Sequence, residues 1–453
     1  MSSTLVASES KTIPIIPGHP ILGNTGDFAK GTRQFVQRIV KEYPEGIAHA
    51  KIAFRDFYLM YHPELVQHVL VKNHHNYVKS FAYDGIRTFL GNGLLTNEGD
   101  FWKKQRRSIQ PAFHRTRIAD MTTQMAAQTD ALMDEWEELG VSQLDLQSEM
   151  GQLTRDIISL ALFGPENYDP AESKMLSDAL FCFRNYANDR MKNPFMAPLF
   201  VPTEYNRTFK SYRKDLQRIV FDAIHACEQS YTEGAPTIVQ MLMEIGRETG
   251  ETMSHQQLYD EIVTIYVAGQ ETTTNALFFL FHLLATHPEV ERKVLAEVDG
   301  MASDGLPTVE EIRGLSYCRM VIQETLRIYP PAWAISRTNL EADHVCGYHI
   351  PKGTIQFLPL YALHHDESYW GDPAVFRPER WADGAKHRDM YLPFGSGPRV
   401  CIGNEFSLLE MQVVMAVLLR RFRLAHQSGK ELDLITPMTM GPRHPVKFDL
   451  KPR

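Results

Sequence analysis

The chain has few cysteines and no long hydrophobic run, and both absences narrow what the protein can be. Its 453 residues include only five cysteines, an odd number in which no two form a Cys-x-x-Cys pair. This usage excludes a disulfide scaffold and favours a reducing compartment, so we expect a cytoplasmic protein. The longest apolar stretches, 276–285 and 413–419, are far shorter than the roughly 20 residues that cross a bilayer. We therefore expect buried helices there and no transmembrane anchor.

The chain also lacks an excess of positive charge. Its 47 Lys and Arg residues face 55 Asp and Glu residues, which gives a formal net charge of −8. Nucleic acid is therefore not an expected partner. Residues 1–20 lack the basic and then apolar segments of a signal peptide. No linker or internal repeat divides the sequence, so we expect a Pro/Gly-rich lead-in over 1–26 and a single domain over 27–453.

Most of the remaining sequence has apolar residues at spacings of three and four, which is typical of helices. Such patterns cover residues 63–71, 100–110, 118–138, 152–163, 172–186, 204–234, 253–286 and 320–329. Alternating apolar and polar residues over 48–61 predict a hairpin, and two brief strands are expected on either side of a turn at 351–353. The fold class predicted is mainly α with small β-sheets (α+β), and the sheet is drawn from separate parts of the sequence.

One cysteine stands in a glycine-rich loop directly before a strong helical pattern. Residues 394–403 read Phe-Gly-Ser-Gly-Pro-Arg-Val-Cys-Ile-Gly, and the helical pattern covers 404–419. The N-terminal dipole of that helix and the charge of Arg399 both favour a thiolate at Cys401. An isolated cysteine is more often a small buried hydrophobic residue. Here glycines on both sides of Cys401, at 397 and 403, leave room for something flat against the loop.

Two other readings of this loop fail on spacing. A dinucleotide fingerprint begun at Gly395 meets Val400 where its third glycine belongs. A zinc site would need a second Cys or His at ligand spacing from Cys401, and none is there.

The loop resembles the signature Phe-x-x-Gly-x-Arg-x-Cys-x-Gly of the cytochrome P-450 superfamily of haem-thiolate monooxygenases, and all five specified positions match. The resemblance implies the cytochrome P-450 fold, with haem b between the long central helix and the helix after the cysteine loop. It makes Cys401 the axial ligand of the haem iron and packs Phe394 beside the sulfur. It also pairs Arg399 with a haem propionate, and it implies N–H donors to the sulfur from the chain after Cys401, at Gly403.

The long helical pattern over 253–286 contains Ala-Gly-Gln-Glu-Thr-Thr at 268–273. Ala268 and Thr272 share a helical face, and a bond from Thr272 to the Ala268 carbonyl would favour a local bulge or kink. Alone, the hexapeptide is also compatible with an ordinary buried helix. It resembles the family's oxygen-activation motif, which assigns Thr272 to the bound dioxygen and Glu271 to the proton relay.

Two further patterns gain meaning only from the resemblance. Glu324 and Arg327 lie three apart on a helix, a spacing that is common on solvated helices. The family completes a buried structural cluster with the arginine that matches Arg380. Trp102 and Arg106 share one helical face, and the resemblance makes both haem-propionate partners. Arg337 falls where the family usually supplies another such cation, although a surface arginine remains an alternative.

The resemblance implies an enzyme that inserts one oxygen atom from O2 into a lipophilic substrate. Because no flavin or iron–sulfur motif follows Cys401, we expect electrons from a separate ferredoxin or flavodoxin-type donor with its NAD(P)H reductase, and we expect a monomer. Basic residues at 103, 104 and 107 can guide an acidic donor, unless they are simply solvated charges. Arginines at 87, 184 and 190 are possible anchors for a substrate carboxylate.

Three alternatives remain open. A peroxide-using peroxygenase or a haem-thiolate isomerase would share the cysteine loop, and a non-catalytic haem sensor would need only the haem. The intact pair of Glu271 and Thr272 argues against all three. Family analogy places the substrate pocket among residues 81–95, 181–183, 268, 272, 334–335 and 438–440. Most of these residues are apolar, and packing in the protein core would explain their apolar character equally well.

Overall fold

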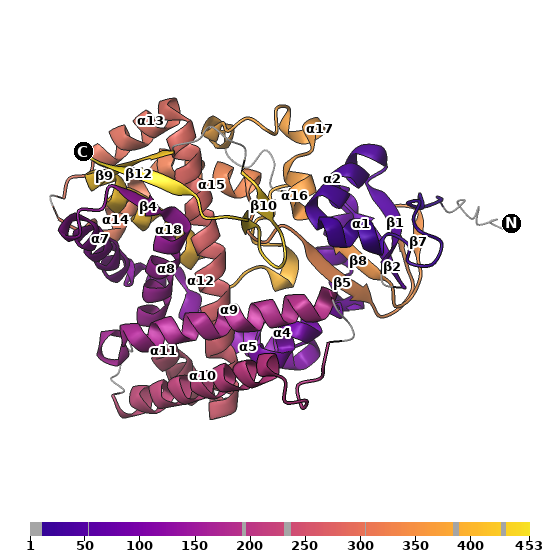
Figure 1. Cartoon of the computed structure of the whole chain (residues 1–453), viewed down its shortest axis with the longest axis horizontal. Coiled ribbons are helices and arrows are strands. Elements are labelled where there is room, and N and C mark those ends of the chain that lie inside the picture. The colour runs from indigo at the N-terminus through magenta and orange to yellow at the C-terminus, as the bar shows by residue number, and fades with distance from the viewer. Residues whose placement is uncertain are drawn as a thin grey trace, which may run out of the picture. The chain divides into compact units, whose positions relative to one another are not determined.

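The computed structural model describes residues 11–52, 54–192, 196–230, 237–303, 305–383, 389–426 and 432–453. The chain divides into two compact units (Figure 1). The sheet unit comprises Met1–Ala82, Ala332–Val375 and Ala385–Cys401, and the helical unit comprises Tyr83–Pro331, Phe376–Gly384 and Ile402–Arg453. Part of the expected lead-in (1–10) and the end of the helix expected over 204–234 (231–234) lie outside the described residues. The single domain over 27–453 stays a prediction.

The sheet unit is built on a mixed five-stranded sheet in the order β1-β2-β8-β5-β3. Its elements, with a separate β6-β7 hairpin, are α1 Thr25–Lys30, α2 Thr32–Glu42, β1 Ile47–Ile52, β2 Arg55–Met60, α3 Pro63–Gln67, η1 His68–Lys72, η2 His74–Asn76, β3 Tyr77–Lys79, β5 Ile335–Asn339, β6 Asp343–Val345, β7 Tyr348–Ile350, β8 Ile355–Leu358, α16 Leu360–His364, α17 Glu367–Trp370 and η6 Gly397–Arg399. The antiparallel pairing of β1 and β2 confirms the predicted hairpin. The two strands predicted around 351–353 exist, but β7 pairs with β6 while β8 lies between β2 and β5.

The helical unit holds most of the helices and two small sheets, β4-β12-β9 and β10-β11. Its elements are α4 Ala82–Leu90, α5 Gly99–Ile109, η3 Gln110–Phe113, α6 Arg115–Ala119, α7 Thr122–Glu138, β4 Gln143–Asp145, α8 Leu146–Phe163, η4 Pro165–Asn167, α9 Pro170–Lys192, α10 Glu204–Gln229, α11 Ile238–Thr249, α12 His255–Thr286, α13 Pro288–Asp299, α14 Val309–Gly314, α15 Ser316–Ile328, η5 Pro378–Trp381, α18 Asn404–Arg421, β9 Phe422–His426, β10 Leu434–Ile435, β11 Gly441–Pro442 and β12 Lys447–Pro452. A mainly α fold with small sheets is thereby confirmed.

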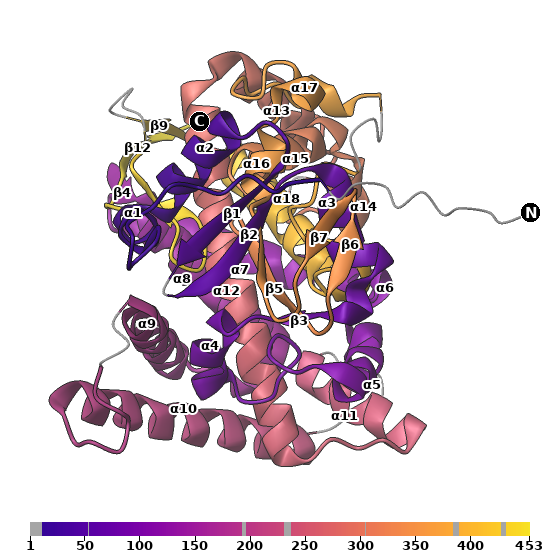
Figure 2. The ribbon, with the colours of Figure 1, turned by 90° about the vertical axis from the view of Figure 1, so that its right-hand side faces the viewer.

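Helix α12 is the centre of the helical unit. It packs along α8 and also contacts α10, α13, α15 and α18, while α9 and α10 run side by side (Figures 1 and 2). A helix that is buried on most sides needs apolar residues around its whole circumference, and 276–285 supply them. Ser254 caps its N-terminus by accepting the Gln257 N–H at 3.2 Å. No helix among the described residues combines the length and apolar character that a membrane crossing requires.

Two predicted helices are divided, since the pattern over 63–71 forms α3 and the π-helix η1. The pattern over 118–138 forms α6 and α7, with a break at Asp120 and Met121. The Thr122 hydroxyl donates to the Ala119 carbonyl at 2.8 Å and so satisfies a carbonyl that the end of α6 leaves free. No glycine or proline marks this break, so the sequence pattern gives no sign of it.

Candidate active site

The cysteine loop belongs to the sheet unit and is closed by its own backbone. The Cys401 N–H donates to the Phe394 carbonyl at 2.9 Å, and the Leu392 N–H donates to His364 Nε2 at 2.9 Å. The first bond closes the loop, and the second ties its start to α16. Cys401 itself is exposed. The loop therefore presents its sulfur from a fixed backbone.

Gly397 is required by a close backbone approach. Its φ is +71°, and a Cβ on it would lie 2.0 Å from the carbonyl oxygen of Leu70 in η1. The space that Gly397 leaves is thus filled by η1, so its interpretation as room for a flat group is wrong. Around Gly403 a Cβ would meet only Phe113, at 3.9 Å, so this glycine does leave open space.

Cys401 differs in solvent exposure from Cys227 and Cys318, which are buried. Burial raises the pKa of the Cys227 thiol to about 11 and the pKa of the Cys318 thiol well above its ordinary value. Burial also raises the thiol pKa of Cys182 and of Cys346. The thiols of these four residues are therefore less acidic than an ordinary cysteine thiol.

The centre of α12 carries the candidate oxygen motif. Residues 258–266 and 273–284 are buried, whereas 267–272 between them are not. Thr272 Oγ1 donates to the Ala268 carbonyl at 2.6 Å, as expected from their spacing. A Cβ on Gly269 would lie 3.1 Å from Ile158 on α8, so this glycine permits close helix packing. The helix continues through these residues as one element, and the expected local bulge or kink stays a prediction.

Glu271 is held by two side chains from other elements. Its Oε1 accepts from Arg184 Nη1 on α9 at 2.7 Å and from Thr439 Oγ1 at 2.6 Å. Arg184 and Glu271 are both partly exposed, at 29% and 25% of their side-chain surface. The sequence suggests Arg184 as an anchor for a substrate carboxylate, but in the structure its carboxylate partner is Glu271.

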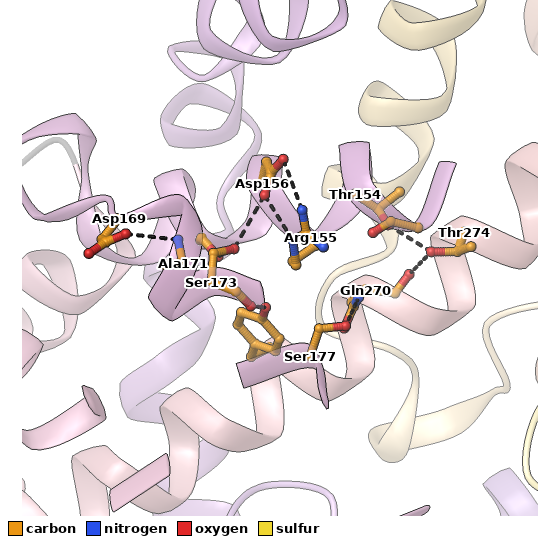
Figure 3. A network of polar contacts seen from close by, with 12 residues as sticks. Thr154, Arg155, Asp156, Asp169, Ala171, Ser173, Ser177, Gln270 and Thr274 are labelled. Atoms are coloured by element: carbon orange, nitrogen blue, oxygen red, sulfur yellow. Dashed lines mark hydrogen bonds and ion pairs between the residues drawn. The ribbon is translucent and has the colours of Figure 1, made fainter. Parts of the chain in front are cut away.

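The residues on either side of Glu271 fasten α12 to α8 and α9 (Figure 3). Gln270 Nε2 donates to Ser177 Oγ on α9 at 2.9 Å. Thr274 Oγ1 lies 2.9 Å from the Gln270 carbonyl and 2.7 Å from Thr154 Oγ1 on α8. Two neighbouring helices, α8 and α9, therefore fix the backbone that carries Glu271 and Thr272.

The structure brings Glu324, Arg327 and Arg380 together inside the helical unit. Glu324 is fully buried, and its oxygens accept from Arg327 Nε at 2.9 Å, Arg327 Nη2 at 2.8 Å and Arg380 Nε at 2.9 Å. Trp381 Nε1 at 3.0 Å and the Arg377 N–H at 3.2 Å complete the donors to Glu324. With five donors, the buried carboxylate is compensated for its lost hydration.

The expected propionate partners lie in both units. In the helical unit, α5 carries the buried Trp102 and the partly exposed Arg106. In the sheet unit, Arg337 on β5 is 7% exposed and donates from Nη1 to the Ser336 carbonyl at 2.9 Å. Arg337 is thus a buried cation and not a surface residue.

Comparison with known proteins identifies the family. The family model described as Cytochrome P-450 matches residues 14–452. The chain belongs to the cytochrome P-450 family. One similar relative is cyclooctat-9-en-7-ol 5-monooxygenase of Streptomyces melanosporofaciens, which is 34% identical over 91% of this chain and 89% of the relative. Another is a cytokinin hydroxylase of Arabidopsis thaliana, which is 31% identical over 86% of this chain and 78% of the relative. The crystal structure of the cytochrome P-450DA haem domain, 26% identical, superposes with a TM-score of 0.88 over 98% of this chain and 99% of that one.

As a cytochrome P-450, the protein is a haem-thiolate monooxygenase that uses O2, a substrate and a redox partner. The described residues fit a haem with a thiolate ligand. Within the sheet unit, the exposed Cys401 stands on a closed loop, and the buried Arg337 offers N–H donors of the kind that suit a propionate. An unburied stretch of small and polar residues interrupts the otherwise buried α12.

Sequence reasoning missed several residues of this cytochrome P-450 that the structure joins to the candidate site. Ser177 carries no motif, and Thr439, expected only as part of the substrate pocket at 438–440, lies 168 positions from the Glu271 carboxylate to which it donates. Trp381 also donates to Glu324. Its place directly after Arg380 is the one sequence feature that could have indicated this role.

Proposed function

We propose that this cytochrome P-450 hydroxylates a lipophilic substrate at haem b held by the Cys401 thiolate. The observation that carries the proposal is the closed cysteine loop, where the Cys401 N–H bonds to the Phe394 carbonyl at 2.9 Å and leaves the residue exposed. Haem, when bound there, supplies the centre at which dioxygen is activated and an oxygen atom is transferred. Arg399, Arg337 and Arg106 would neutralise its propionates, and the Trp102 indole N–H would donate to one of them.

The chain's own contribution is proton supply and positioning on α12. The Thr272 hydroxyl gives its hydrogen to the Ala268 carbonyl, so its lone pairs can accept a hydrogen bond from a water and hold it. Glu271 stands next in the chain, partly exposed, and transfers protons from solvent to that position. Arg184 and Thr439 position the Glu271 carboxylate.

The substrate class is a lipophile, and a cyclic terpenoid-like alcohol is favoured. The bacterial relative is named for the oxidation of a cyclic alkenol, cyclooctat-9-en-7-ol. Residues 267–272 are the part of central α12 that is not buried, so they are the side chains of this helix that a substrate could contact. A spectral screen of cyclic terpenoid alcohols, fatty acids and steroids tests this choice, because substrate entry changes the Soret band.

Electrons come from a ferredoxin or flavodoxin-type donor with its NAD(P)H reductase, and the enzyme acts as a monomer. The basic residues on α5 support the docking of an acidic electron donor less strongly than the sequence suggests, because two of them pair with acidic residues of the chain itself. Lys103 pairs with Asp100 at 3.0 Å and Lys104 with Glu251 at 3.5 Å. Reconstitution with each donor type, read as substrate-dependent NAD(P)H consumption, decides between them.

Reduction with dithionite under carbon monoxide tests the proposed ligand. The purified protein should show the red-shifted Soret band of thiolate-ligated haem, and Cys401→Ser should lose it. Cys346→Ser is the matched control, because Cys346 is also exposed. A red-shifted band that persists in Cys401→Ser would exclude Cys401 as the ligand.

A further inference from the structure

A cluster of metal-ligating side chains lies on the helical unit, away from the proposed haem site. His225 and Glu228 stand one turn apart near the end of α10, and His255 is the first residue of α12. Glu228 Oε2 lies 3.3 Å from His225 Nδ1, and Glu228 Oε1 lies 2.8 Å from His255 Nε2. Their ligand atoms all lie within 4.8 Å of one another. No other such trio occurs in the part of the chain that the structure describes.

The two helices hold these side chains in place. One turn from the histidines, the rings of Phe221 on α10 and Tyr259 on α12 are stacked with centroids 5.2 Å apart. The rings of His225 and His255 lie 5.0 Å apart at 85°. Figure 2 shows α10 meeting α12 at the foot of the helical unit. The aromatic stack therefore fixes the spacing from which the ligand atoms converge.

We propose that His225, Glu228 and His255 bind a divalent transition-metal ion of the Zn²⁺ type, which links the end of α10 to the start of α12. Two imidazoles and one carboxylate are a donor set that Zn²⁺ uses, with water in the fourth position. Zn²⁺ bonds of 2.0–2.2 Å place tetrahedral ligand atoms about 3.3 Å apart. The contacts of 3.3 Å to His225 and 2.8 Å to His255 use different oxygens of Glu228, and all the ligand atoms lie within 4.8 Å of one another, so side-chain rotations would bring them around one ion.

The charge and accessibility of the cluster suit an ion from solution. Glu228 places a carboxylate between the two imidazoles. The side chains are 36–54% exposed, which leaves an open path for the ion and for its water ligand.

This site is separate from the oxygen chemistry. His255 and Glu271 are 16 positions apart on α12, which corresponds to about 24 Å along a helix. The ion would cross-link two helices and would not touch the haem, so its loss should leave the monooxygenase active. Stabilisation follows because only the folded chain brings the three ligands together.

Zinc titration of the holoenzyme tests the proposal, with a zinc-sensitive fluorescent indicator as competitor. We expect one equivalent to bind and the thermal midpoint to rise by a few degrees. His255→Gln and Glu228→Gln should each weaken binding by roughly tenfold or more and abolish that rise. Because these side chains are partly exposed, the variants should keep the native Soret band and thermal midpoint without zinc.

The matched control is the double variant His344→Gln/His349→Gln. These two imidazoles face each other across β6 and β7 with ring centroids 4.7 Å apart, but no carboxylate joins them in a trio. The control should bind zinc as the unaltered enzyme does. Equal zinc affinity in His255→Gln and the unaltered enzyme, or no saturable binding by the holoenzyme, would overturn the proposal.

Discussion

Arg184 on α9 donates from Nη1 to Oε1 of Glu271 on α12 at 2.7 Å. The same oxygen accepts from Thr439, so the acid next to Thr272 is fixed from two directions. The Arg184 guanidinium also lies over the Phe181 ring, 4.9 Å from its centroid, which restricts its own position. The candidate proton carrier is therefore oriented by a helix other than the one that bears it.

Arg184→Gln should lower the fraction of consumed O2 that appears as product. The variant removes the ion pair that orients the Glu271 carboxylate, so proton supply is slowed and more oxygen is lost as peroxide. Because Arg184 acts through Glu271, the double variant with Glu271→Gln should be no worse than Glu271→Gln alone.

Arg190→Gln is the control for this experiment. Arg190 is also on α9 and lies over an aromatic ring, but it donates to the Tyr186 hydroxyl at 3.0 Å. Its replacement should leave coupling unchanged. Additive losses in the Arg184 and Glu271 double variant would show that Arg184 acts by another route.

Thr272→Ala should raise peroxide release and lower product formation by roughly tenfold or more, because the hydroxyl that holds the proton-carrying water is lost. The measurement is product and peroxide per O2 consumed. Thr286→Ala is matched, since Thr286 Oγ1 makes the same bond to the carbonyl four residues earlier, His282, at 2.9 Å. Unchanged coupling in Thr272→Ala would remove Thr272 from this role.

The parts that could be predicted from the sequence are local. The hairpin of β1 and β2 follows from alternation, and the contact of Thr272 with Ala268 follows from a spacing of four. Glu324 and Arg327 are three apart and do meet, although nothing local shows that they are buried.

The parts that could not be predicted depend on tertiary packing. Arg184 and Glu271 are 87 positions apart, and no pattern on α9 distinguishes Arg184 from Arg190. The place of β8 between β2 and β5 is equally hidden, because strands of alternating residues do not encode their neighbours. The role of Gly397 was misread because the carbonyl it accommodates belongs to Leu70, far away in the sequence.

Arg380→Ala should lower the free energy of unfolding by about 3–5 kcal/mol, because it leaves the buried Glu324 with fewer compensating donors. Urea unfolding followed by circular dichroism measures the change. Arg443→Ala breaks an exposed pair with Asp433 of 2.7 Å and should cost about 0–1 kcal/mol. Equal losses of unfolding free energy in both variants would mean that the buried cluster stabilises the fold no more than an exposed ion pair does.

Gly397→Ala should destabilise the sheet unit more than Gly353→Ala. Both glycines have positive φ, +71° and +73°, so both variants carry a backbone penalty of about 1–2 kcal/mol. A Cβ at 353 meets nothing within 4 Å, whereas at 397 it meets the Leu70 carbonyl at 2.0 Å. The difference in unfolding free energy therefore measures the clash, and equal losses would show that the loop can move away from η1.

Glu261→Gln should stabilise the protein increasingly as pH rises. Burial, together with Asp260, raises the Glu261 pKa from 4.5 to about 8 despite the N–H that Leu94 donates at 2.9 Å. Oε1 of Glu261 is buried with no hydrogen-bond partner among the described residues, so a negative charge on this carboxylate would be poorly compensated. Between pH 4.5 and 8 the unfolded chain has released this proton and the folded chain has not, so the stability of the unaltered protein falls as pH rises.

A glutamine has no such proton, so the stability difference between Glu261→Gln and the unaltered protein should grow by about 4 kcal/mol from pH 5 to pH 8 and then level off. Urea unfolding at several pH values measures it. Glu248→Gln, at an exposed position on α11, should follow the unaltered protein at every pH. A constant offset between Glu261→Gln and the unaltered protein would mean that Glu261 is ionised in the folded state, and its carboxylate would then need a cation or a further donor beside Oε1.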